Sequence, residues 1–396
     1  MIVLVALPVF LLLVLSSYIV VMPILGSLRL RAAKPQCSSQ RSSLPRILVL
    51  IPAHNEGEHL RPTLRSIQHL DYPSRLFDIV VIADNCTDNT ANVAIGEGCE
   101  VWERSNDSAR GKGYALGWAL SHPQIASYDA CVILDADTQP SSNLLEVFAR
   151  EMQLESVPVQ ARVNFEFPST GPYWLSLMST ATQRAEEHYV CATRSHLKLY
   201  QGLQGTGFCV PVGILQIVPW STCSVCEDLE YGFQLAAHGV PIRFVQDASV
   251  TTVMTGRLKN AGAQRERWAR GTYGLIARLI PLQFLRAFTK RDWKSLESCF
   301  YLMTRSRLSL IFLTAISSVA LLIGRHTVTH GIWISFGIAL TLECAYALAL
   351  LATLRAQYSW TQLIFGFSRY SIWIIRQHLG ALLSVRSKHW VRTERG

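Results

Sequence analysis

Two aspartates follow a short apolar run near the middle of the chain. Asp135 and Asp137 stand two residues apart, directly after the apolar segment Cys131–Leu134. In an extended segment their side chains would share one face, and in a tight turn both could reach one cation. Hard carboxylate ligands of this kind suit Mg²⁺ or Mn²⁺ bound together with phosphate oxygens. The pair is therefore a candidate divalent-cation site, although two aspartates at this spacing also occur by chance.

Two further segments could contact a nucleotide. Asp84 follows the apolar run Ile79–Ala83, where its carboxylate could accept a hydrogen bond from a base or form a helix-capping turn. The sequence Arg110-Gly111-Lys112-Gly113 places two cations and two glycines before a helix, where backbone N–H groups suit phosphate. A short basic glycine loop is also explained as a solvated turn.

Charged residues later in the chain complete the candidate set. Glu227, Asp228 and Glu230 lie at the start of a predicted helix, Leu229–Ala237. The helix macrodipole favours acids there, which accounts for Glu227 and Glu230 without a catalytic role. The segment Gln264–Trp268 predicts a basic helix near a membrane surface, where cations meet anionic headgroups and a tryptophan anchors the interface.

Strand and helix patterns alternate along the first half of the chain. Apolar runs rich in branched residues predict strands, and amphipathic stretches predict the helices between them. This order indicates a parallel sheet with helices on both faces, and it places ligands outside the carboxyl ends of the strands. Asp84, Asp135 and Asp137 would then meet at one edge. The predicted strands are Ile47–Ile51, Ile79–Ala83, Glu100–Arg104 and Cys131–Leu134, and the predicted helices are Glu58–His69, Asp88–Ile95, Lys112–Leu120 and Asn143–Gln153.

The composition of the 396-residue chain excludes a disordered or fibrous protein. Charged residues make up 16%, below the roughly 25% typical of soluble domains, and hydrophobic residues make up 49%. Few charges combined with a net charge of +9 favour a membrane protein whose bases face the cytoplasm over a nucleic-acid binder. The ten cysteines show no paired zinc-site spacing, so we expect free thiols and no structural metal.

Three apolar segments are candidates for crossing a membrane. Residues 1–28 carry no charge and lead into Arg29 and further bases, which favours an anchor over a signal peptide and places the next domain in the cytoplasm. Leu308–Gly324 and Gly331–Leu354 together predict a transmembrane hairpin. The alternative for each segment is a helix buried in a protein core. Glu343 lies within this hairpin and is expected to face protein or a polar path, because a charge in lipid is costly.

Taken together, these segments resemble the family 2 glycosyltransferases. More narrowly, the chain is similar to the membrane-bound synthases of cellulose, chitin, hyaluronan and poly-N-acetylglucosamine. The resemblance extends from Ile47 to Gly271, and its most specific element is QxxRW. The shared motifs are, in order, Ile51–Glu56, Asp84, Asp135 with Asp137, Glu227 with Asp228, and Gln264-x-x-Arg267-Trp268.

The resemblance implies a GT-A fold, a UDP-sugar donor and a bound Mg²⁺ or Mn²⁺ ion. Asp228 would be the general base, and attack opposite the leaving group predicts inversion at the anomeric carbon. The ion would be held by Asp135 and Asp137, with Asp137 the direct ligand, and Arg267 would help to stabilise the diphosphate leaving group. The remaining implied contacts are Glu56 and Asp84 with the nucleoside, Lys112 near the nucleotide, Asp135 with the sugar-nucleotide, Gln264 with the diphosphate, Trp268 with the acceptor and, more weakly, the loop Gly205–Gly207 with a sugar.

The leading interpretation is a membrane-bound, inverting glycosyltransferase that extends a growing saccharide in envelope or extracellular polysaccharide synthesis. Single transfer to a membrane lipid is the alternative, because one anchor plus a hairpin supplies fewer helices than the channels of polymer-secreting synthases. A catalytically silent scaffold subunit is the rival class, which would be expected to lose at least one motif residue. The expected partners are a UDP-sugar, a saccharide or lipid acceptor, membrane lipids and other polysaccharide-synthesis or export proteins, but no nucleic acid.

The resemblance and the apolar pattern together predict a multi-pass cell-membrane protein with a cytoplasmic catalytic domain. Tyr358–Val385 is apolar and aromatic with scattered bases, which suits a helix lying in the membrane interface. His389–Arg395 is similar to gating segments of some synthases, or is a plain basic tail. The expected divisions are an anchor at 1–28, a basic linker at 29–45, a GT-A domain at 46–275, interfacial helices at 276–307, the transmembrane hairpin at 308–354, and an interfacial helix and basic tail at 355–396.

Overall fold

The computed structural model of the chain describes residues 2–30, 43–305, 307–352, 354–355 and 357–384. Most of the predicted linker and the segment His389–Arg395 lie outside these residues. The described residues form two compact units. The α/β unit comprises the described parts of Ala33–Gly171 and Arg194–Ala261, and the helical unit comprises those of Met1–Ala32, Pro172–Thr193 and Gly262–Arg386.

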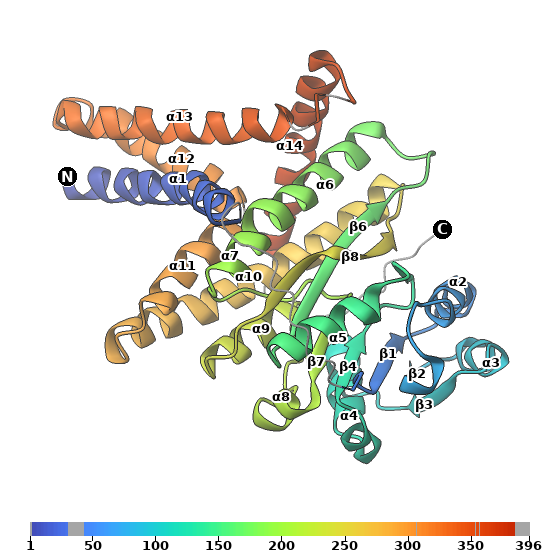
Figure 1. The fold of residues 1–396 in the computed structure, drawn as a ribbon. Coiled ribbons are helices and arrows are strands. Elements are labelled where there is room, and N and C mark those ends of the chain that lie inside the picture. Colours follow the sequence, from blue (N-terminus) through green and yellow to red (C-terminus); the bar gives the residue numbers. More distant parts are fainter. Residues whose placement is uncertain (1, 31–42, 306, 353, 356, 385–396) are drawn as a thin grey trace. The chain divides into compact units, whose positions relative to one another are not determined.

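An eight-stranded sheet forms the centre of the α/β unit, in the order β3-β2-β1-β4-β7-β6-β8-β5 (Figure 1). The first four strands of this order are parallel, as the alternating sequence pattern predicts. Each observed strand lies within two residues of its predicted bounds. These strands are β1 (Ile47–Ala53), β2 (Phe77–Asp84), β3 (Glu100–Arg104) and β4 (Ala130–Ile133).

The second half of the sheet, for which the sequence pattern predicted no strands, contains antiparallel pairs. β7 (Phe208–Pro211) is antiparallel to both β4 and β6 (Val159–Glu166). β8 (Arg243–Val253) is parallel to β6 and antiparallel to β5 (Thr138–Pro140). β5 and β7 span three and four residues, too short for a sequence pattern to reveal, and pairing direction depends on the connections rather than on local periodicity.

Helices cover both faces of the sheet because alternate side chains of a strand point to opposite sides. In β1, Ile47, Val49 and Ile51 pack with α2, α3 and α5, whereas Leu48 and Leu50 pack with α4 and α9. The helices of this unit are α2 (Gly57–Gln68), α3 (Thr90–Gly96), α4 (Lys112–Leu120), α5 (Leu144–Leu154), α8 (Val212–Ile217) and α9 (Glu227–Ala237). Short turns are η1 (Ser74–Leu76) and η2 (Pro123–Ser127), and α7 (Ala192–His196) carries the chain back into the unit.

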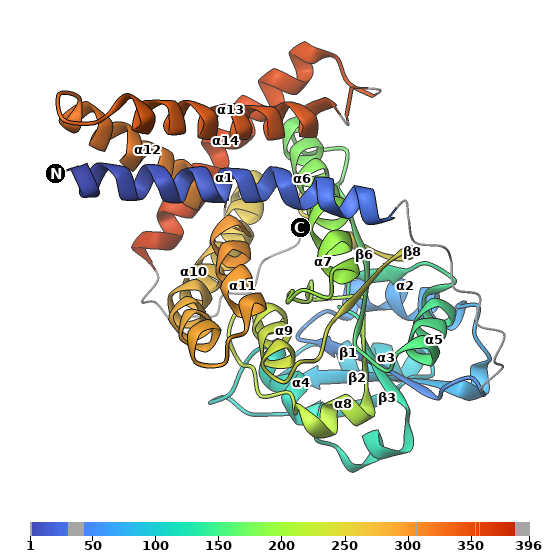
Figure 2. The ribbon, with the colours of Figure 1, turned by 60° about the vertical axis from the view of Figure 1, so that its left-hand side comes forward.

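The helical unit consists of long helices and one π-helical turn. α1 packs lengthwise against α12 and α13, as Figure 2 shows, and α14 packs against α6. The elements are α1 (Ile2–Leu30), α6 (Tyr173–Ala185), the π-helix η3 (Glu186–Cys191), α10 (Leu258–Thr289, which begins in the α/β unit), α11 (Trp293–Arg305), α12 (Arg307–Gly324), α13 (His330–Ala352) and α14 (Trp360–Leu383).

Among the residues that the structure describes, two helices are long and apolar enough to cross a membrane: α1, over its segment Ile2–Leu25, and α13. α12, the first arm of the predicted hairpin, is long and apolar enough to cross a membrane only if it is counted together with α11. The axes of these two helices are bent by 87° relative to each other. Glu343 of α13 faces protein, as expected. Its Oε1 accepts hydrogen bonds from Ser16 Oγ of α1 at 3.0 Å and from Thr314 Oγ1 of α12 at 3.4 Å.

Candidate active site

The predicted site residues of the α/β unit follow the carboxyl ends of parallel strands. Glu56 comes after β1, Asp84 ends β2, and Asp135 and Asp137 come after β4. The two aspartates lie in a tight turn closed by a hydrogen bond of 3.1 Å from Thr138 N to Asp135 O. Because these strands are parallel, their ends share one edge of the sheet, as the sequence predicts.

Lys112 links three parts of this edge. Its Nζ lies 2.5 Å from Asp135 Oδ1, 2.6 Å from the carbonyl oxygen of Gly205, and 4.0 Å from Glu227 Oε1. Burial disfavours the ammonium charge, but the carboxylates of Asp135 and Glu227 outweigh it and raise the pKa of Lys112. Lys112 is thus a fixed cation at the start of α4 that holds two carboxylate-bearing segments together.

The loop Gly205–Gly207 contacts both Lys112 and Asp135. Gly205 and Gly207 have φ of +81° and +67°, a left-handed conformation that favours glycine. Thr206 Oγ1 accepts a hydrogen bond of 2.9 Å from Asp135 N. An added Cβ on Gly205 would lie 3.5 Å from Asp228 Oδ2, so the backbone approaches this carboxylate closely.

Gln160 supports the loop and was not identified from the sequence. Its side chain is 2% exposed, and its Nε2 donates to the carbonyl oxygens of Thr206 at 2.9 Å and Gly207 at 3.2 Å. Its Oε1 accepts from Gln204 N at 2.9 Å. The only sequence signal is a polar residue between Val159 and Ala161 in an otherwise apolar run, which does not reveal these partners.

Glu227 and Asp228 begin α9 opposite Lys112. Glu227 is 8% exposed, and burial together with the neighbouring Asp228 raises its pKa to about 8 despite the opposing effect of Lys112. The helix macrodipole accounts for acidic residues at this position, because it favours their charged form. It does not account for the raised pKa of Glu227, which keeps this side chain largely in the neutral acid form near pH 7. The first turn of α9 therefore contributes a buried acid and, one residue later, the predicted base.

Replacing Glu227 by glutamine is expected to flatten the pH dependence of stability. Between the ordinary pKa of 4.5 and the folded value of about 8, the folded protein keeps a proton that the unfolded chain has released. The free energy of unfolding is therefore highest, as far as Glu227 is concerned, at low pH. It decreases as the pH rises toward 8, by up to about 1.4 kcal/mol per pH unit. Unfolding midpoints from tryptophan fluorescence should fall more steeply with pH in the wild type than in the variant, and equal slopes would contradict the assignment.

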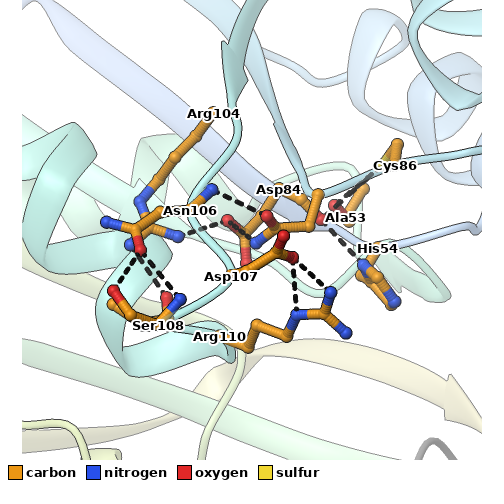
Figure 3. Close-up of polar contacts among 11 residues, drawn as sticks. Ala53, His54, Asp84, Cys86, Arg104, Asn106, Asp107, Ser108 and Arg110 are labelled. Carbon is orange, nitrogen blue, oxygen red and sulfur yellow. Dashed lines mark hydrogen bonds and ion pairs between the residues drawn. The ribbon is translucent and has the colours of Figure 1, made fainter.

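The predicted nucleoside contact Asp84 is already engaged within the protein. Its Oδ1 accepts a hydrogen bond from Arg104 Nη1 at 2.5 Å, as drawn in Figure 3. The same oxygen accepts a second hydrogen bond from Asn85 Nδ2 at 2.9 Å. His54 Nδ1 lies 2.8 Å from the Asp84 carbonyl oxygen, which ties the ends of β1 and β2 together. Arg104 is a second residue that sequence reasoning did not single out, because it partners Asp84 only through the pairing of β2 with β3.

The basic glycine loop divides into two roles. Arg110 pairs with Asp107 on the surface, which agrees with the solvated-turn explanation for this residue (Figure 3). Lys112, two residues later, is directed to Asp135 instead. The structure thus gives the two cations of this loop different carboxylate partners.

The aspartate pair fits a cation that arrives with a nucleotide. Within the described ranges, no group of three or more His, Cys, Asp or Glu side chains is arranged to hold a metal. Asp135 already contacts the Lys112 ammonium, and Asp137 is 7% exposed. A cation at this turn would therefore be held by these two carboxylates at most, and Mg²⁺ in proteins is commonly held by one or two carboxylates plus substrate phosphates and water.

The QxxRW residues belong to the helical unit, on α10. The guanidinium carbon of Arg265 lies 5.0 Å from the centre of the Trp268 ring. Glu266 Oε1 accepts hydrogen bonds from Arg270 at 3.0 Å and from Ser384 of α14 at 3.1 Å. These contacts fix the segment that holds Gln264 and Arg267 against α14.

The cysteines agree with the expectation of free thiols. The nine cysteines in the described part of the chain are all unpaired with one another, including Cys223 and Cys226.

The fold is similar to that of a solved mannosyltransferase, PcManGT from Pyrobaculum calidifontis, in complex with GDP-Man and Mn²⁺. The TM-score is 0.56 at 18% sequence identity, covering 95% of this chain and 99% of that one. At this identity the similarity bears on the fold alone, and it confirms the predicted GT-A fold.

Curated relatives are transferases with several acceptors. Glucomannan 4-beta-mannosyltransferase 7 of Arabidopsis thaliana is 20% identical over 391 residues, covering 89% of this chain and 67% of the relative. Probable glycosyltransferase YdaM of Bacillus subtilis is 23% identical over 265 residues, covering 65% and 62%. Beta-monoglucosyldiacylglycerol synthase of Nostoc sp. is 26% identical over 255 residues, covering 59% and 50%. The matches thus span about half to two-thirds of these relatives' lengths.

The sequence model of the glycosyltransferase-like family 2 matches residues 45–271. This segment is more than half of the 396 residues, and it contains every predicted site residue from Glu56 to Trp268. The described residues include two helices that are long and apolar enough to span a membrane. The family match shows that the chain belongs to glycosyltransferase family 2, as its motif order indicates.

Proposed function

We propose that this protein is an inverting, membrane-bound transferase that moves a sugar from a UDP-sugar onto a growing saccharide. The observation that carries the proposal is the cluster at the sheet edge, where Lys112 joins Asp135 to the Glu227–Asp228 pair. The proposed acceptor-side pair and the proposed donor-side aspartate turn thereby both lie within 4.0 Å of one half-buried cation.

The proposed donor contacts are those that the family motifs imply. Glu56 and Asp84 contact the nucleoside, and Asp135 contacts the sugar-nucleotide beside Lys112. Gln264 and Arg267 of α10 contact the diphosphate, and Trp268 contacts the acceptor. Gln264 Oε1 is buried and receives no hydrogen bond from the described residues, which leaves this acceptor available to a ligand.

The proposed divalent ion, Mg²⁺ or Mn²⁺, is held by Asp137 with Asp135 beside it. When bound, it supplies positive charge to the diphosphate oxygens as the sugar–oxygen bond breaks. Arg267 contributes a second positive charge, so departure of the nucleoside diphosphate needs no general acid.

Asp228 acts on the acceptor. Its carboxylate takes the proton of the attacking hydroxyl, and attack from the face opposite the diphosphate gives inversion. Glu227 stays largely protonated at neutral pH, because burial and Asp228 raise its pKa to about 8. It therefore limits the negative charge beside Asp228 rather than competing for the acceptor proton.

A GDP-sugar donor and a lipid acceptor are the second candidates. PcManGT is described with GDP-Man, the Arabidopsis relative is a mannosyltransferase, and the Nostoc relative is a glucolipid synthase. The candidate spanning helices would place either acceptor at a membrane.

In the proposed topology the protein is multi-pass, with the catalytic domain on the cytoplasmic side and the domain bounds expected from the sequence. Other polysaccharide-synthesis or export proteins would be its partners.

The test is nucleotide release by the detergent-purified chain across a panel of UDP- and GDP-sugars. We expect release from one donor with Mg²⁺ or Mn²⁺ and none with a chelator. Sizing the radiolabelled product then separates a polymer from a glycolipid, and the anomeric configuration of the product tests inversion. A chain that binds no nucleotide from the panel would contradict the transferase proposal.

A further inference from the structure

The helical unit contains an apolar cavity that the proposed reaction does not use. It has a volume of about 330 Å³ and lies among α1, α13 and the junction of α6 with the π-helix η3. Its lining is almost entirely hydrocarbon. The lining residues are Ile19, Val20, Pro23, Ile24, Ala185, Tyr189, Ala345, Tyr346, Ala349 and Leu350.

Three local features of the sequence open this cavity. Pro23 lies inside α1, where it removes a backbone hydrogen bond and disturbs regular helix packing. Tyr189 lies in η3, a π-helical turn that widens the backbone. Ala345 and Ala349 are four residues apart, so they share one face of α13 and leave space that larger side chains would fill. The cavity therefore results from small and irregular residues in three separate elements.

The position of the cavity between two apolar helices indicates the chemical class of its ligand. α1 and α13 are the two helices long and apolar enough to cross a membrane, and they run in the same direction. Val9 of α1 lies in one cluster with Phe336 of α13, and Ile19 lies in one with Tyr346. The cavity thus lies near the carboxyl end of both spans, on the side where α1 leads into the basic segment that begins at Arg29. An apolar space between spanning helices meets acyl chains rather than water.

We propose that this cavity binds the hydrocarbon tail of a membrane lipid. In this proposal the acyl chain lies among Pro23 of α1, Ala349 of α13 and Tyr189 of η3, which all line the cavity. Packing an acyl chain against this lining is favourable because the chain gains van der Waals contacts and very little polar surface has to be desolvated. The proposal depends on the helical unit alone and not on the transfer reaction, so the two can fail independently.

The test uses a diacylglycerol whose acyl chain carries a photoreactive diazirine, added to the purified full-length protein in detergent micelles. We expect saturable labelling, mapped by mass spectrometry to the peptides containing Tyr189 and Tyr346. Ala349→Trp should reduce this labelling at least about fivefold, because the indole would occupy the space of the acyl chain. Ala345→Leu, a smaller change, should give a partial reduction.

The matched control is Leu348→Trp, the neighbouring position on α13, which is 57% exposed and does not line the cavity. It should keep full labelling at Tyr189 and Tyr346. Thermal unfolding of all three variants shows which of them are folded. If the Ala349→Trp variant does not fold, the labelling of the Ala345→Leu variant decides the outcome. Labelling spread evenly over the exposed apolar residues of α13, or unchanged by both alanine substitutions, would overturn the proposal.

Discussion

Replacing Asp228 by asparagine is expected to slow sugar transfer by about 10²–10⁴-fold while nucleotide binding stays unchanged, the range typical of lost general-base catalysis. Asparagine keeps the shape of the side chain at the start of α9 but has no carboxylate to accept the proton of the acceptor hydroxyl. The loss should therefore appear in kcat. The measurement is nucleotide release at saturating donor, together with the Kd for the nucleoside diphosphate.

The matched control for this experiment is Asp107→Asn. Asp107 undergoes the same chemical change but is exposed and pairs with Arg110 on the surface. We expect its transfer rate to equal that of the wild type. Near-normal turnover by the Asp228 variant would remove the base assignment, and a loss confined to nucleotide affinity would move Asp228 to the donor site.

Replacing Asp137 by asparagine is expected to lower metal-dependent transfer by about 10³-fold. An ion on the diphosphate supplies several kcal/mol of charge stabilisation, and each 1.36 kcal/mol corresponds to about tenfold in rate. In the proposed site Asp137 is the direct ligand, whereas Asp135 contacts the Lys112 ammonium. Mn²⁺-dependent nucleotide binding by calorimetry should therefore fall further in Asp137→Asn than in Asp135→Asn.

Asp129→Asn provides the control at the opposite end of β4. The Asp129 carboxylate accepts a hydrogen bond of 2.7 Å from Arg46 N, away from the carboxyl ends of the strands. Its replacement should leave the metal dependence of nucleotide binding unchanged. If the Asp137 variant retained wild-type Mn²⁺ dependence, the assignment of the cation site to this turn would be wrong.

The parallel half of the sheet could be predicted because its information is local. Ile47, Val49 and Ile51 alternate with Leu48 and Leu50, and each set is buried on its own face of the sheet. The same alternation of strands and helices places Asp84 and Asp135 at one edge, because parallel strands end together. The antiparallel half was missed, because four-residue strands such as β7 show no periodicity of their own.

The motif residues could be named from the sequence, but their partners could not. Lys112 was expected near a nucleotide, yet its Nζ contacts Asp135 and the carbonyl of Gly205, which is 93 residues further along the chain. Asp84 was expected at the nucleoside, and the structure adds an ion pair with Arg104. The hydrogen bond from Gln160 to Thr206, which supports the Gly205–Gly207 loop, joins residues 46 positions apart in the chain.

By itself, the sequence determined the family, the parallel half of the sheet, the sheet edge where the candidate site residues lie, and the apolar segments that form α1 and α13. These follow from residue types, short spacings and hydrophobic periodicity, which are properties of neighbouring residues. The tertiary structure decided which charges meet, that Glu227 is buried with a raised pKa, and that α1, η3 and α13 enclose a cavity. Pairing and burial depend on contacts between residues far apart in the chain, and the energies of these contacts exist only once the elements have packed.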